Sequence, residues 1–126
     1  GTVFRTVARM RQEDAKVLMQ HHRYHGALYL AGYAVECALK YSVTRREGAV
    51  YLRTELETHH LDTLLQQSGL RPALDKAPRI MACYGVLADW WEPALRYEAP
   101  SLNPGKARVL YNNVVQLYDW IIEQTE

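Results

Sequence analysis

Small and apolar residues recur every three or four positions between residues 23 and 43, which is the spacing of a helix with a broad buried face. They are Ala27, Leu30, Ala31, Ala34, Val35, Ala38 and Leu39. Two charges interrupt this helix, and Glu36 stands four residues before Lys40, the favourable order for an ion pair along a helix. Tyr29 and Tyr33 fall on the same side as these charges. A polar stripe on an otherwise buried helix predicts that a cleft, a partner or a second subunit faces it.

The same stretch is nearly long enough to span a membrane, since residues 26–43 approach the length of about 20 apolar residues that a bilayer core requires. On insertion scales, however, Glu36 and Lys40 would each cost roughly 2.5–3.5 kcal/mol. The segment from residue 2 to residue 20 is charged and mixed, without the short basic flank and apolar run of a signal peptide. We therefore expect neither a membrane span nor a signal peptide.

Further helices follow from apolar spacing and from the residues that begin and end helices. A first helix is predicted over residues 12–22, and a short turn after it makes it an antiparallel neighbour of the central helix. Residues 44–57 are polar and predict a loop or a frayed helix end, with a short helical turn around residues 50–56. Thr58 is typical of the cap before a third helix, which Gly69 closes.

The second half of the chain predicts two more helices. Pro78 suits the first turn of a fourth helix, which Pro93 ends, and residues 99–105 predict a loop. The last helix has the clearest periodicity, with apolar positions at Ala107, Leu110, Tyr111, Val114, Leu117, Tyr118, Ile121 and Ile122. No stretch keeps the alternation of a strand. The sequence thus predicts an all-α, up-and-down bundle of about five helices in one domain over residues 1–126, with the central and last helices packed together.

Composition agrees with this prediction and also indicates the cellular compartment. The chain has 126 residues, of which 48% are hydrophobic and 23% charged, as in one ordinary globular domain. Cys37 and Cys83 fall within apolar helical patterns, which predicts buried free thiols and a reducing compartment, the cytoplasm. A net charge of +1 does not by itself indicate nucleic acid. The three histidines of residues 21–25 lack a Cys or carboxylate partner in register, so we expect no metal and no cofactor.

Three segments, taken in order, resemble a known family. The helix Tyr29–Lys40, the pair His60-Leu61 at the start of a short Leu-rich helix, and the segment Trp91–Tyr97 are similar to signature elements of the HEPN domain. This is a helical-bundle family of prokaryotes and higher eukaryotes, and the resemblance covers residues 8–122. It implies a homodimeric bundle associated with nucleotide or RNA chemistry. It also implies a separately encoded nucleotidyltransferase as partner, as in two-gene toxin–antitoxin systems.

The ribonucleases of this family use an Arg that is followed, after about four to six residues, by a His. Arg96 matches the Arg, but no histidine follows His60 anywhere in the chain. The resemblance therefore implies a non-catalytic binding module for nucleotide or RNA, or the helical partner of a nucleotidyltransferase. One alternative is a metal-independent endoribonuclease toxin with a displaced site, where Arg53 and His59 have five residues between them and His60 is adjacent. Another is a purely structural interaction domain.

The polar stripe and the segment around Arg96 supply the candidate binding residues. These are Arg96, Tyr97, Glu36, Lys40, Tyr33 and His60. Arg96 has two interpretations that stay open, a buried pair with Glu36 across the bundle and a contact with an anion. His60, at the start of a helix, suits either a phosphate or a structural hydrogen bond to a neighbouring helix.

Overall fold

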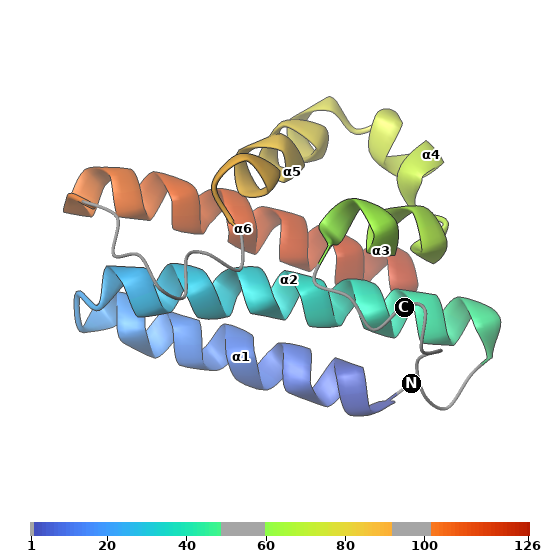
Figure 1. Ribbon diagram of the computed structural model, residues 1–126, viewed down its shortest axis with the longest axis horizontal. Helices are drawn as coiled ribbons and strands as arrows, with labels where there is room; N and C mark the ends of the chain where they lie inside the picture. The colour runs from blue at the N-terminus through green and yellow to red at the C-terminus, as the bar shows by residue number, and fades with distance from the viewer. Residues whose placement is uncertain (1, 49–59, 92–101) are drawn as a thin grey trace.

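Six helices make up the fold in a computed structural model that describes residues 2–48, 60–91 and 102–126. Three long helices run along the long axis of the molecule, and three shorter ones lie on one side of them (Figure 1). The helices are α1 (Thr2–Gln20), α2 (Tyr24–Glu47), α3 (Leu61–Ser68), α4 (Arg71–Asp75), α5 (Pro78–Trp90) and α6 (Pro104–Thr125). The described residues contain no strand, and the predicted all-α class is confirmed.

Helix α1 begins at Thr2, well before the predicted start at residue 12. Ala8 and Ala15 are completely buried against the rest of the bundle, and Phe4 packs against Val43 of α2. The prediction was wrong because this buried face is narrow and built largely from small side chains, so its apolar signal is weak. α1 therefore lies along nearly the whole length of α2 (Figure 1).

Helix α2 also extends beyond its predicted end, because residues 44–47 are helical rather than part of a loop. Thr44 is fully buried and its hydroxyl donates to the carbonyl of Tyr41 at 3.0 Å, which satisfies this polar side chain inside the helix. Gly48 then ends the helix in the left-handed conformation, with φ 70°. The helical turn predicted around residues 50–56 lies outside the described residues.

The shorter helices largely follow their predicted boundaries. Gly69 closes α3 with φ 77°, as expected, but α3 begins after His60 rather than after Thr58, which lies outside the described residues. Pro78 occupies the first turn of α5, also as expected. α4 was not predicted, because its five residues are too few to show a period.

Helix α6 begins at Pro104, inside the predicted loop of residues 99–105. The side chain of Asn103 accepts the backbone N–H of Lys106 at 2.8 Å, so Asn103 caps the helix and a proline follows in the first turn. The buried positions of α6 match the predicted period and are Ala107, Val114, Leu117, Tyr118 and Ile121.

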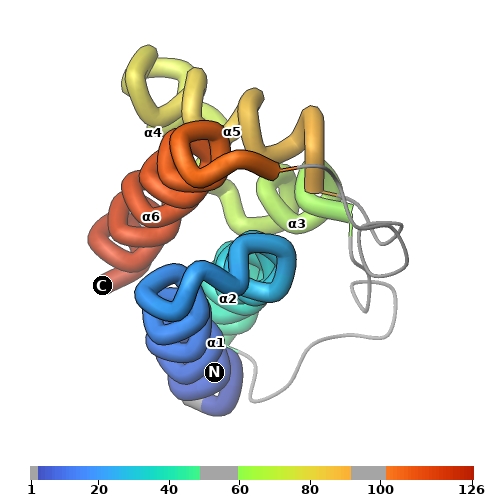
Figure 2. The backbone as a smooth tube through the Cα atoms, turned by 90° about the vertical axis from the view of Figure 1, so that its left-hand side faces the viewer, coloured from blue at the N-terminus to red at the C-terminus, as the bar shows by residue number. Residues whose placement is uncertain are grey.

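The core lies around α2, which packs against α1, α6 and α3, while α5 covers α6 (Figure 2). The predicted packing of the central and last helices is confirmed, with Ala38 at 0% and Ile121 at 1% exposure in one cluster. Cys37 and Cys83 are buried free thiols, as expected. Within residues 2–48, 60–91 and 102–126, no helix is long and apolar enough to cross a bilayer.

Candidate functional site

The charged pair of α2 lies inside the protein rather than on its surface. Glu36 is 0% exposed, and its Oε2 accepts from the Lys40 Nζ at 3.1 Å, one turn further along the helix. The side chain of Lys40 is only 13% exposed. The predicted ion pair is confirmed, but the few tenths of a kcal/mol expected of an exposed pair no longer apply, because both groups have lost most of their water. Lys40 is thus the member of this pair that reaches the solvent.

Tyr33 and Cys37 lie beside the ion pair on the same side of α2. Burial, and then the negative charge of Glu36, raise the pKa of the Cys37 thiol to about 11. The pKa of the Tyr33 phenol is also raised, first by burial and then by Cys37 and Glu36. Both groups are therefore neutral at pH 7, and their side chains are hydrogen-bonded to each other.

Arg11 of α1 is a charged neighbour of this group that sequence reasoning missed. Its positive charge lowers the pKa of Cys37, against the larger effect of burial. Its Nη2 pairs with Asp14 at 3.3 Å, whereas its Nε is buried with no hydrogen-bond partner in the described part of the chain. The sequence offered one indication of this position, because Arg11 stands on α1 between Ala8 and Ala15, which are both buried.

Trp91, at the end of α5, packs against α2 one turn before Glu36. The Trp91 ring lies directly against Gly32, so closely that a Cβ at this position would overlap the indole. Its Nε1–H donates to the carbonyl of Tyr29 at 3.2 Å, and the two rings stack with centroids 6.5 Å apart. Trp91 thereby places the end of α5 beside the polar stripe.

Of the remaining predicted site residues, the structure describes His60 alone. His60 is exposed at the N-terminus of α3, a separate helix, and its side chain does not cap that helix. Four others, Arg53, His59, Arg96 and Tyr97, lie outside the described residues. The predicted pairing of Arg96 with Glu36 and the displaced Arg53–His59 site therefore stay predictions.

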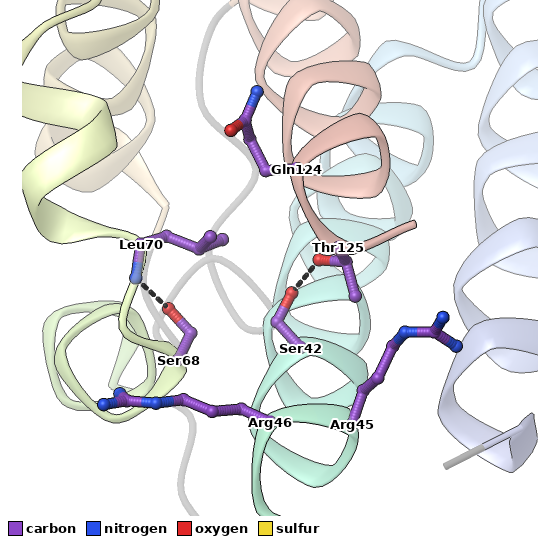
Figure 3. Close-up of a pocket in the computed structure, with 7 residues that line it drawn as sticks. All are labelled: Ser42, Arg45, Arg46, Ser68, Leu70, Gln124 and Thr125. Atoms are coloured by element: carbon purple, nitrogen blue, oxygen red, sulfur yellow. Dashed lines mark hydrogen bonds between the residues drawn. The ribbon is translucent and has the colours of Figure 1, made fainter.

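A second polar site lies where the ends of α2, α3 and α6 meet (Figure 3). This cavity of about 150 Å³ is lined by Ser42, Arg45, Arg46, Ser68, Leu70, Gln124 and Thr125. The hydroxyls of Ser42 and Thr125 bond to each other across it, and the two guanidinium groups point away from each other (Figure 3). Arg46 donates to the carbonyl of Gln67 at 3.2 Å, near the C-terminus of α3. These contacts join three helix ends, which explains the polar residues without a ligand.

No group of three or more His, Cys, Asp or Glu side chains that could hold a metal ion occurs in the described ranges. The charged cluster of α2 consists of Tyr33, Glu36 and Lys40, with Arg11 of α1 as a charged neighbour. A family model described as the HEPN domain matches residues 4–125, nearly the whole chain. No curated protein and no solved structure is significantly similar to this chain.

Proposed function

Because this chain belongs to the HEPN domain family, we propose that it is a non-catalytic binding module for a nucleotide or RNA. The observation that carries the proposal is the charged cluster on α2, where a completely buried carboxylate, Glu36, holds the ammonium of Lys40. Burying such a pair is expensive, and folds gain little stability from it, so a functional role is the better reason for its presence.

Recognition in this proposal rests on phosphate contacts. Glu36 fixes Lys40 with its head at the border of the solvent, and Arg11 adds a second cation from α1. Arg96, which follows Trp91 by five residues, supplies a third cation in the family's characteristic segment. The phenol of Tyr33 is hydrogen-bonded to Cys37, and its ring offers a face to a base. A histidine to move protons beside Arg96 is missing from the sequence, which favours binding over cleavage.

The module works as a homodimer in the cytoplasm, and a separately encoded nucleotidyltransferase is its protein partner in a toxin–antitoxin pair. Light scattering behind size exclusion tests the dimer directly, since it distinguishes one 14.5 kDa chain from two. A nucleotidyltransferase gene next to this one supports the two-component role, which is then tested by co-purification of the two expressed proteins.

The binding test uses RNA, a chelator and a salt series. Wild type should bind RNA without cutting it, and affinity should fall steeply as salt rises, because phosphate contacts release counterions. Arg96→Ala should weaken binding by about tenfold or more. Arg71→Ala is the matched control, since Arg71 is an exposed arginine paired with Asp75 on α4 and should leave binding unchanged.

Two results would contradict this function. Chelator-resistant cleavage by wild type that His59→Ala abolishes would establish the displaced ribonuclease instead. Absence of any salt-sensitive binding to RNA or nucleotides would leave a purely structural interaction domain.

A further inference from the structure

The outer face of α1 carries a ridge of exposed apolar side chains. Its members are Val3, Met10 and Val17, which are 66%, 44% and 52% exposed and are three of the four exposed large hydrophobic residues in the described ranges. Ala8, which α1 buries completely, stands two residues before Met10 and therefore about 200° around the helix. The same holds for Ala15 and Val17. The ridge thus lies nearly opposite the buried face of α1, and no described element covers it (Figure 2).

The spacing of the ridge suits pairing with another helix along its length. Its residues stand seven apart, which is the period of helices that pack nearly parallel or antiparallel to each other. From Val3 to Val17 the ridge extends about 21 Å, or nearly four turns of α1. Single exposed apolar residues on a surface need no explanation, but a row at this period is typical of a helix that docks on another helix.

The partner that this ridge fits is a second copy of the chain. When two copies of α1 lie antiparallel about a two-fold axis at Met10, each Val3 meets the Val17 of the other copy. The two Met10 side chains meet at the axis, where their flexible thioethers adjust to each other. The match holds along the whole ridge because its residues are evenly spaced. Two-fold interfaces require this self-complementarity, since both subunits contribute the same surface patch.

Charges beside the ridge complete the match. Arg9 and Glu13 are exposed, lie on one side of the ridge and form no ion pair with each other or with another described residue. In an antiparallel pair the same sides of the two helices face each other, so Arg9 of each copy comes beside Glu13 of the other. Two reciprocal ion pairs then flank the axis. An unrelated helix would need a matching row of charges, whereas a second copy supplies it.

From these features we propose that two copies of this chain pair through the outer face of α1. This interface rests on the homodimer of the proposed function and supplies its contact surface. One pair of helices buries less than the roughly 800 Å² per partner of a standard interface, so the dimer is weak and forms as concentration rises. The ridge shares no residue with the α2 cluster. Both copies therefore keep their cluster for a ligand, and the dimer binds a long RNA at two points.

Sedimentation equilibrium over a concentration series measures the dissociation constant of the dimer. Met10→Asp places two like charges together at the axis and should raise that constant by about a hundredfold or more. The melting temperature of this variant should stay close to that of wild type, because the Met10 side chain is exposed in the monomer. Val109→Asp is the matched control, since Val109 is 61% exposed on α6, outside the ridge, and should leave the dimer unchanged.

Two further sets of variants test the geometry. Arg9→Glu and Glu13→Arg should each weaken the dimer by about tenfold, because each sets like charges against each other. The double variant should recover, since exchanging the two charges restores both ion pairs. Met10→Cys should form a disulfide between copies under mild oxidation, because the axis brings residue 10 against itself. Val3→Cys should cross-link only when mixed with Val17→Cys.

A dimer that persists in Met10→Asp and does not cross-link through Met10→Cys would overturn the α1 interface but leave the homodimer standing. Cross-linking of Val3→Cys to itself would overturn the antiparallel arrangement. Wild type that stays one 14.5 kDa chain at every concentration would overturn both the interface and the homodimer, but not RNA binding by the α2 cluster. Met10→Asp should keep wild-type affinity for a short oligonucleotide, and a loss of that affinity would contradict the separation of the ridge from the α2 cluster.

Discussion

Gly32→Ala should destabilise the domain even though alanine is the better helix former. Gly32 lies inside α2, where this exchange alone stabilises a helix by about 1 kcal/mol. An added Cβ, however, would overlap the indole of Trp91, whose Nε1–H donates to the carbonyl of Tyr29 at 3.2 Å. The sign of the effect therefore depends on whether the collision outweighs the helix propensity.

The structure indicates that the collision is the larger effect. Trp91 is 4% exposed and belongs to the main core cluster, and forcing an extra carbon into a packed core costs about 1–3 kcal/mol. A displaced indole also loses its hydrogen bond, which adds about 0.5–1.5 kcal/mol. After the propensity gain is subtracted, Gly32→Ala should lower the free energy of unfolding by about 2 kcal/mol. For a domain of this size, that lowers Tm by roughly 6–12 °C.

Denaturant and thermal unfolding followed by circular dichroism measure this effect in a double-mutant cycle. The cycle comprises wild type, Gly32→Ala, Trp91→Ala and the double variant. Without the indole the collision disappears, so Gly32→Ala should become stabilising by up to about 1 kcal/mol in the Trp91→Ala background. Gly85→Ala is the matched control, because Gly85 is an exposed glycine inside α5 whose added Cβ meets nothing within 4 Å, and it should stabilise.

If Gly32→Ala destabilises wild type but stabilises the Trp91→Ala variant, the effect comes specifically from the Gly32–Trp91 contact. If Gly32→Ala stabilised wild type as Gly85→Ala does, or shifted both backgrounds equally, the indole would not lie against Gly32. The placement of the end of α5 beside the polar stripe would then be wrong as well.

Three further predictions use the same measurements or a simple chemical probe. Ile121→Asp places an unpaired charge in the core and should unfold the domain at 37 °C by circular dichroism, whereas wild-type melting would disprove the packing of α2 on α6. Glu36→Ala should lower the free energy of unfolding by about 3–5 kcal/mol, because it leaves the ammonium of Lys40 without its buried partner. Asp75→Ala, in an exposed ion pair of the same spacing, should lower it by under about 1 kcal/mol. Equal losses for the two variants would contradict the burial of Glu36. Alkylation of Cys37 should be slow at pH 8 and accelerate towards pH 11, because the thiolate forms only as pH rises through the raised pKa; a midpoint near 9 would refute this.

Much of the fold was predictable because its signals are local. Gly69 and Pro78 mark helix boundaries through their own backbone geometry, and both were placed correctly. The packed face of α6 was also predictable from the sequence, since large apolar residues recur along it. The first turns of α1 were not predicted, because Ala8 and Ala15 contribute little hydrophobicity although both are completely buried.

The site was predictable only within one helix. Glu36 and Lys40 stand four residues apart, so their ion pair followed from helix geometry, but the depth of their burial depends on elements distant in the sequence. The contact of Trp91 with Gly32 joins residues that are far apart in the sequence, and only the three-dimensional fold reveals it. The period of a single helix carries no information about such long-range partners.

Helix α1 contributes side chains to two different parts of the molecule. Arg11 and Gln12 are consecutive, so their side chains leave α1 about 100° apart. The charge of Arg11 acts on Cys37 beside the charged cluster of α2, whereas Gln12 lines a groove between α1 and α6 beside Tyr111. Each has a buried polar atom without a partner among the described residues. A long, polar first helix with a narrow buried face allows both placements, because a broad apolar face would have filled one of the two positions.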